Sequence, residues 1–235
     1  MRSFQRFVPA TVAGLCLFAL GGSASAHVSL AGPGFAKQNQ VLTFSIGHGC
    51  EGADSYKLEI AIPKEVTSVR GMPSVWGDAD VRTDATGAPV SVVWSKASVR
   101  PLDDQFYQMA IRIGVPDMAF RTLYFPAVQT CRTPDGTESI VEWKALPDEI
   151  TAAPKGEEPE PAPSLLILPP RSAGWNRYTV PEAVTDLSVF KDALIVWAGD
   201  AAYSANPATT EQITNEKGVT LLEEIAAGTE IWVKY

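Results

Sequence analysis

The most constraining feature of the sequence is a series of short apolar segments, rich in β-branched residues and separated by proline and glycine, between residues 27 and 150. In residues 57–62 and 108–113, apolar and polar side chains alternate, which is the period of a strand with one buried face. No comparable helical period is present. This pattern predicts an antiparallel all-β sandwich or barrel. Strands are expected at residues 41–46, 56–62, 90–94, 106–115, 123–129 and 139–143.

The first 26 residues have the three parts of a secretory signal peptide. Arg2 and Arg6 supply the positive start, residues 8–20 the apolar core, and Ala24-Ser25-Ala26 the cleavage box. The apolar core is shorter than the roughly 20 residues of a spanning helix, and no later segment is as apolar. We therefore expect cleavage after Ala26, export to the periplasm or beyond the cell, and no membrane span in the mature protein.

The charge balance limits the partners of such a protein. The chain has 19 Lys and Arg against 27 Asp and Glu, a net charge of −8, and cleavage would remove two of the cations. An acidic protein without a basic cluster repels nucleic acid and anionic lipid. We expect neither as a partner.

The cysteines fit an exported protein. Cys16 lies in the predicted signal peptide, which leaves Cys50 and Cys131. In an oxidising compartment the pair is expected to form a disulfide, which would stabilise the fold by about 4 kcal/mol in the loop-entropy model. The alternative is a pair of thiolate metal ligands.

A change in composition divides the chain. Residues 154–170 begin with a run rich in proline and glutamate, which is typical of an extended linker. The predicted organisation is a signal peptide at 1–26, a β-sandwich at 27–153, a linker at 154–170 and a small C-terminal extension of unknown role at 171–235.

Within the extension, the apolar runs at 194–197 and 231–233 are candidate strands. Asp186 and Thr220 are candidate helix starts, the second followed by Glu223 as in a capping box, and a helix is predicted around 221–227. A segment of this size is marginal alone, so we expect it to pack on the sandwich or around its own aromatic residues.

Motifs of enzymes are missing from the sequence. There is no nucleophile elbow and no phosphate-binding glycine loop, and the two histidines, His27 and His48, leave little for a catalytic triad. The chain is therefore not expected to be an enzyme.

Cleavage after Ala26 would give His27 both a free α-amine and an imidazole. The pKa of an α-amine is near 8, low enough for a strongly bound metal to displace its proton. The amine nitrogen and Nδ1 can chelate one ion, and two nitrogen donors in a tetragonal arrangement favour Cu(II). The alternative is a solvated chain end that binds nothing.

Several motifs in a fixed order resemble the YcnI-like copper-binding domain family of bacterial exported proteins. They are His27-Val28, His48-Gly49-Cys50, the AIPKEV of 61–66, the VQTC of 128–131, and Asp135-Gly136-Thr137 leading to the IVEW of 140–143. The resemblance covers residues 27 to about 150. It implies a β-sandwich of cupredoxin-like appearance and one Cu(II) ion held by an N-terminal histidine, its amine and an acid, with a tryptophan nearby. We therefore expect an antiparallel β-sandwich of cupredoxin or immunoglobulin type with a small α+β extension.

Carried onto this chain, the resemblance makes His27 the bidentate ligand, Trp143 the tryptophan and Glu51 the acid, with Glu142 in reserve. A carboxylate would complete an N,N,O donor set, and the indole would shield the ion and offer its π-face. The alternative for Trp143 is an ordinary core residue. His48 is either a second ligand, forming a brace with His27 as in copper mono-oxygenases, or a strand-end histidine beside the disulfide.

The sequence thus predicts a periplasmic, non-enzymatic Cu(II)-binding protein of copper homeostasis, acting as metallochaperone, buffer or delivery protein. Its expected partners are one copper ion and other periplasmic copper-handling proteins. Two alternatives stay open. One is a copper-dependent oxidase or mono-oxygenase that uses a His27/His48 brace, and the other is a structural or interaction module without metal.

Overall fold

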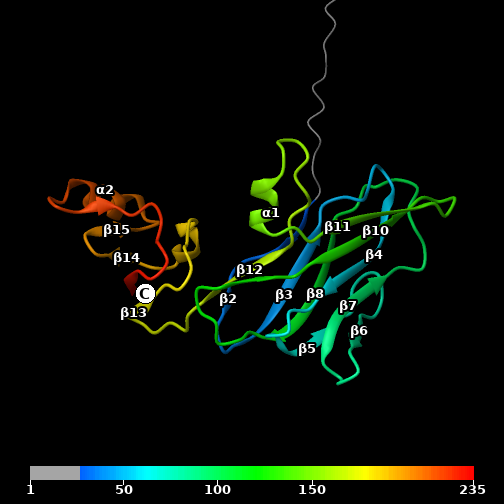
Figure 1. Ribbon diagram of the computed structural model, residues 1–235, viewed down its shortest axis with the longest axis horizontal. Coiled ribbons are helices and arrows are strands. Elements are labelled where there is room, and N and C mark those ends of the chain that lie inside the picture. The colour runs from blue at the N-terminus through cyan, green and yellow to red at the C-terminus, as the bar shows by residue number, and fades with distance from the viewer. Residues whose placement is uncertain (1–26) are drawn as a thin grey trace, which may run out of the picture.

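Two antiparallel sheets enclose the main core of the protein, whose structure is a computed structural model that describes residues 27–235 (Figure 1). The predicted signal peptide, with Cys16, lies outside the described residues. The first sheet has the order β1-β3-β8-β5, and the second β11-β10-β4-β7-β6. Their bounds are β1 Val28–Leu30, β3 Asn39–Ile46, β8 Tyr107–Gly114, β5 Thr67–Gly71, β11 Glu138–Trp143, β10 Ala127–Arg132, β4 Asp54–Ala61, β7 Pro89–Ser95 and β6 Asp80–Thr83.

The alternation seen in the sequence produces this core. Met109, Ile111 and Ile113 of β8 are buried, whereas Gln108 just before them and Arg112 between the two isoleucines are exposed. From the facing sheet, Leu58 and Ile60 of β4 and Trp94 of β7 enter the same cluster. The predicted antiparallel β-sandwich is therefore confirmed.

One predicted strand, at 123–129, is divided in the structure. β9 (Thr122–Tyr124) and β10 are separated by Phe125 and Pro126, and Phe125 N donates to the carbonyl of Pro163 at 2.8 Å. Because Pro126 has no N–H to donate to a ladder, the chain leaves one sheet here and enters another. β9 belongs to a three-stranded sheet with the order β2-β12-β9.

The predicted linker is wrong for its second half. β12 (Ser164–Leu168) pairs in parallel with β2 (Gly34–Phe35) and antiparallel with β9, and Leu165 and Ile167 are fully buried in the sandwich core. The proline-rich residues before 164 indicated a linker, although the apolar run that follows them, 165–168, forms a strand whose Leu165 and Ile167 lie in the core. The sandwich unit therefore extends to Leu168, beyond the boundary expected at 153. A short helix, α1 (Pro147–Ala152), precedes this segment.

The C-terminal extension forms a second unit (Figure 1). It is built around its own sheet, whose strand order is β13-β17-β14-β15-β16. The strands are β13 Trp175–Thr179, β17 Glu230–Lys234, β14 Ile195–Ala198, β15 Ala201–Tyr203 and β16 Thr220–Leu221. Phe120 of the sandwich unit inserts into this second core, with ring centroids 5.6 Å from Tyr178 and 6.4 Å from Phe190. The extension is α+β as predicted, and it packs both on itself and on the sandwich.

One of the two expected helix starts in this unit is correct and the other is not. The predicted helix at 221–227 is wrong. Thr220 N donates to the carbonyl of Asp200, Thr220–Leu221 joins the sheet as β16, and residues 222–227 are not helical. The helix of this unit is α2 (Pro207–Asn215), capped by the Asn206 side chain. Asp186 does start a helical turn, the 3-10 helix η1 (Leu187–Phe190), by accepting from Ser188 N. Among residues 27–235, no helix is long and apolar enough to cross a membrane.

Candidate metal centre

His27 lies immediately before β1, at the edge of the first sheet. β1 pairs antiparallel with β3, and Val28 faces Ile46, both of them buried. The His27 side chain itself is 49% exposed. The burial of Val28 therefore fixes the backbone next to His27, while the imidazole stays accessible to a solute.

The imidazole of His27 lies against the indole of Trp143. The two ring centroids are 5.5 Å apart, with an interplanar angle of 70°. Trp143 ends β11, and only 3% of it is exposed. Its Nε1–H donates to Gln129 Oε1 at 3.2 Å, so the indole is held in one orientation by a hydrogen bond as well as by packing. Trp143 is thus both a core residue and the neighbour of His27.

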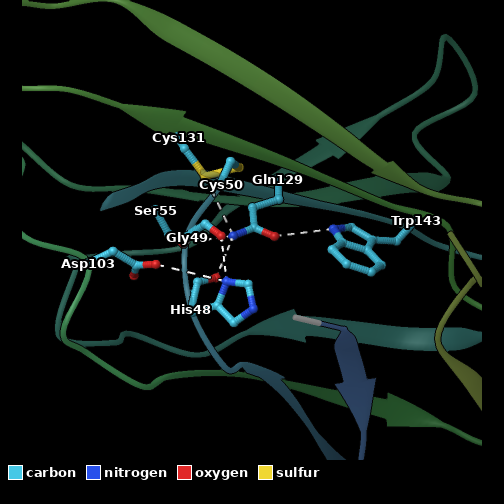
Figure 2. Close-up of a disulfide and its surroundings, with 8 residues drawn as sticks. All are labelled: His48, Gly49, Cys50, Ser55, Asp103, Gln129, Cys131 and Trp143. Atoms are coloured by element: carbon cyan, nitrogen blue, oxygen red, sulfur yellow. Dashed lines mark hydrogen bonds and ion pairs between the residues drawn. A yellow bond between two sulfur atoms is a disulfide. The ribbon is translucent and has the colours of Figure 1, made fainter. Parts of the chain in front are cut away.

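Gln129 lies between Trp143 and the disulfide (Figure 2). The Gln129 side chain is buried, and its Nε2 donates to the backbone carbonyl of His48 at 3.0 Å and to Ser55 Oγ at 2.8 Å. The predicted disulfide between Cys50 and Cys131 is present, and Gln129 Nε2 lies 3.6 Å from the Sγ of Cys131. A continuous buried polar network therefore joins the disulfide to the indole, and the cysteines are not thiolate ligands here.

An acid that the sequence analysis did not select lies next to His27. Glu160 Oε2 is 3.7 Å from His27 Nδ1. The backbone carbonyl of Glu160 accepts from Lys144 N at 3.1 Å and from Ala145 N at 2.9 Å, directly after Trp143 in the chain. Glu160 stands in the predicted linker, and no spacing in the sequence indicates its pairing with the end of β11.

Glu51 and His48 line a cavity of about 250 Å³ together with Trp143 and Glu160. Glu51 occupies a tight turn between Cys50 and Ala53 with a φ of 51°. The predicted acid therefore shares a cavity with Trp143, although the acid beside the imidazole of His27 is Glu160.

The His48 side chain is turned toward the protein at this cavity. His48 Nδ1 donates to the carbonyl of Gly49 at 2.7 Å and lies 3.9 Å from Asp103 Oδ2 (Figure 2). Gly49 cannot carry a side chain, because a Cβ would lie 1.8 Å from the Ala53 carbonyl oxygen. Coordination of a metal by His48 would have to use its Nε2.

The structure does not bring Glu142 to this group. Successive residues of a strand point to opposite faces, and Glu142 precedes the buried Trp143 in β11. Glu142 is exposed and forms an ion pair with Lys144.

The side chains near His27 are of types that bind Cu(II), but there are only two of them. Within residues 27–235, no three or more side chains of His, Cys, Asp and Glu form a group that could hold a metal. One imidazole and one carboxylate meet near His27, and both are donors that Cu(II) accepts. No third side-chain donor of these types joins this pair among residues 27–235.

The chain is similar to one protein family and to two solved structures. The family model described as Domain of unknown function (DUF1775) matches residues 27–167. No curated protein matches the chain significantly. A solved uncharacterized protein from Nocardia farcinica, described as having an immunoglobulin-like fold, is 31% identical over 61% of this chain and 99% of its own, with a TM-score of 0.48. The major pilin subunit BcpA of Bacillus cereus is 8% identical over 89% of this chain and 55% of its own, with a TM-score of 0.35.

Proposed function

The chain belongs to the DUF1775 family, the YcnI-like domain family, and from this premise we propose that it is an exported, periplasmic Cu(II)-binding protein of copper homeostasis. The observation that carries the proposal is the meeting of His27 with Trp143 and Glu160 at the start of β1. The protein would hold one ion for delivery, buffering or protection, with other periplasmic copper-handling proteins as its partners.

Signal-peptide cleavage would supply the missing donor. The amine created at His27 belongs to the same residue as the imidazole, so the amine nitrogen and Nδ1 would bind one ion together in a six-membered chelate ring. The burial of Val28 holds this chain end against β3, which lowers the entropy lost on binding.

Glu160 is the better candidate for the oxygen donor than Glu51. Its carboxylate already lies 3.7 Å from the imidazole, and its backbone is fixed by two hydrogen bonds to the end of β11. A carboxylate lowers the net charge of a bound cupric ion. Glu51, which lines the same cavity, is the second candidate.

Trp143 would cover one side of the ion. An indole has no lone pair for ordinary coordination, so its role is to exclude water and to offer its π-cloud to the cation. The hydrogen bond from Nε1 to Gln129 keeps the indole in place for this.

The proposal is tested by Cu(II) titration of mature protein that starts at His27, beside the same protein with the α-amine of His27 acetylated. We expect one Cu(II) per chain, quenching of tryptophan fluorescence, and binding at least tenfold weaker in the acetylated protein, because its amine is replaced by an amide that has no neighbouring amine to anchor the ion. Unchanged affinity in the acetylated protein would overturn the proposal.

Two acid variants and a control identify the oxygen donor. Glu160→Gln is expected to weaken binding about tenfold, the equivalent of about 1.4 kcal/mol. Glu142→Gln, on the opposite face of β11, should leave it unchanged. If Glu51→Gln weakens binding and Glu160→Gln does not, the donor is Glu51. Trp143→Phe should retain binding with less quenching.

A copper-dependent oxidase with a His27/His48 brace is the second candidate, because His48 lines the same cavity as Trp143 and Glu160. It predicts two imidazole nitrogens in the hyperfine coupling of the electron paramagnetic resonance spectrum, and oxygen consumption with a reductant. The homeostasis proposal predicts one imidazole, loss of tight binding in His27→Ala, and only a small change in His48→Ala.

A further inference from the structure

The outer face of the C-terminal sheet carries three tryptophans. Trp197 of β14 lies directly opposite Trp232 of β17. Trp175 of β13 lies opposite Lys234 of β17. Because Lys234 is two residues after Trp232, all four side chains are on the same face of the sheet. Trp175 is 51% exposed and Trp232 45% exposed. Together with Gly199, the three indoles line an open hollow of about 420 Å³. We call this surface the tryptophan face.

None of the three indoles belongs to the hydrophobic core of the second unit. The alternate residues Val196, Ile231 and Val233 point inward and are fully buried in the core of the second unit. The buried tryptophans of the sandwich, such as Trp94, show the usual place of this side chain. Exposed aromatic side chains gathered at one hollow are typical of a binding surface.

Cations complement the tryptophan face. Lys234 Nζ lies 5.6 Å from the ring centroid of Trp175, and the Arg177 guanidinium 5.8 Å from that of Trp232. Arg177 is paired with Glu230, whereas Lys234 has no carboxylate partner among residues 27–235. In a chain with a net charge of −8, this lysine is placed to meet a carboxylate of a partner.

The hydrogen-bonding groups narrow the class of partner. Within the part of the chain that the structure describes, the indole N–H groups of Trp175 and Trp197 have no hydrogen-bond acceptor, and the hollow is lined by rings and a glycine alone. An extended proline-rich peptide offers apolar rings to stack on indoles and backbone carbonyls that no internal hydrogen bond occupies.

We propose that the tryptophan face binds an extended, proline-rich segment with acidic side chains in a partner protein. The prolines stack on Trp175 and Trp232, and a carboxylate pairs with Lys234. This site belongs to the second unit and is independent of copper binding at His27.

The test uses the full mature protein and a labelled synthetic peptide of alternating proline and glutamate, with binding followed by fluorescence anisotropy. Trp175→Ala and Trp232→Ala are each expected to weaken binding at least tenfold, as truncation of an aromatic anchor does. Phe106→Ala, which removes an exposed aromatic ring from the sandwich unit, is the matched control and should bind as the wild type.

Charge reversal gives the sharper result. Lys234→Glu should weaken binding of the proline-glutamate peptide and strengthen binding of its proline-lysine counterpart. The proposal is overturned if the wild type binds both peptides equally, if neither binds at about 1 mM, the weak end of specific affinity, or if chito-oligosaccharides bind at Trp175 and Trp232 while the peptide does not.

Discussion

Replacing Gln129 by leucine tests whether the polar network behind Trp143 stabilises the fold. Gln129 is 1% exposed, and its amide satisfies three groups: the Trp143 N–H, the Ser55 hydroxyl and the His48 carbonyl. A leucine side chain has about the volume of a glutamine side chain, but it cannot form these hydrogen bonds, so Gln129→Leu leaves the three groups without their partner. An unsatisfied buried polar group costs about 1–3 kcal/mol.

The expected loss follows from how deeply those groups are buried. Trp143 and Ser55 are both nearly inaccessible to water, so neither can replace the lost bond by hydration. Two such groups, offset in part by the burial of the leucine side chain, give a loss of about 2–4 kcal/mol in the free energy of unfolding. This is a large share of the roughly 5–15 kcal/mol that stabilises an ordinary domain.

Urea unfolding of the disulfide-bonded protein measures the effect through tryptophan fluorescence. The midpoint should fall while the slope stays the same, because the surface exposed on unfolding hardly changes. Gln108→Leu is the matched control: Gln108 is exposed on β8, its amide reaches only Ser45 Oγ at 3.3 Å, and its replacement should change stability by less than about 0.5 kcal/mol. If Gln129→Leu is no more destabilising than this control, the network does not carry the stability assigned to it.

Two further predictions concern the second unit. Phe120→Ala should lower its free energy of unfolding by about 3–5 kcal/mol, because Phe120 is buried against Tyr178 and Phe190, and limited proteolysis should then cut the C-terminal unit first; equal protection in both proteins would contradict this. Burial raises the pKa of Tyr178 to about 12, above its ordinary value of 10. Its contribution to stability is therefore complete below pH 10 and is lost as the pH rises from 10 to about 12. Urea unfolding at several pH values should show that Tyr178→Phe loses less free energy of unfolding than the wild type between pH 10 and 12. If the free energy of unfolding depends on pH equally in both proteins, the raised pKa does not belong to Tyr178.

The strands that could be predicted from the sequence are those in which every second residue is buried. β4 and β8 show this alternation because one face of each packs in the sandwich core and the other meets solvent. β6 was missed because it is an edge strand with no buried residue, so its sequence carries no apolar period. Such a strand is specified by its pairing with β7, which is a tertiary interaction.

Local signals in the second unit competed with tertiary pairing. Thr220 and Glu223 have the spacing of a capping box, yet Thr220 N donates to the Asp200 carbonyl and Leu222 N to that of Ala202. Pairing with β15 satisfies these backbone groups better than an isolated helical turn would. The helix that does form begins at Asn206-Pro207, a recognisable cap, but only Ile213 in it is buried, so it has no apolar stripe to reveal it.

At the candidate metal centre, the alternation of side chains along β11 is enough to place Glu142 away from the buried Trp143. If Trp143 faces the core, Glu142 must face away from it, and this conclusion required only the sequence and the period of a strand. The acid beside His27 therefore had to come from another segment. That segment is held by backbone bonds from Lys144 and Ala145 to Glu160, a register that nothing local encodes. Pro159 and Pro161 on either side fix the backbone φ, so the proline-rich composition that indicated a linker instead reduces the entropy lost in holding this carboxylate at the imidazole.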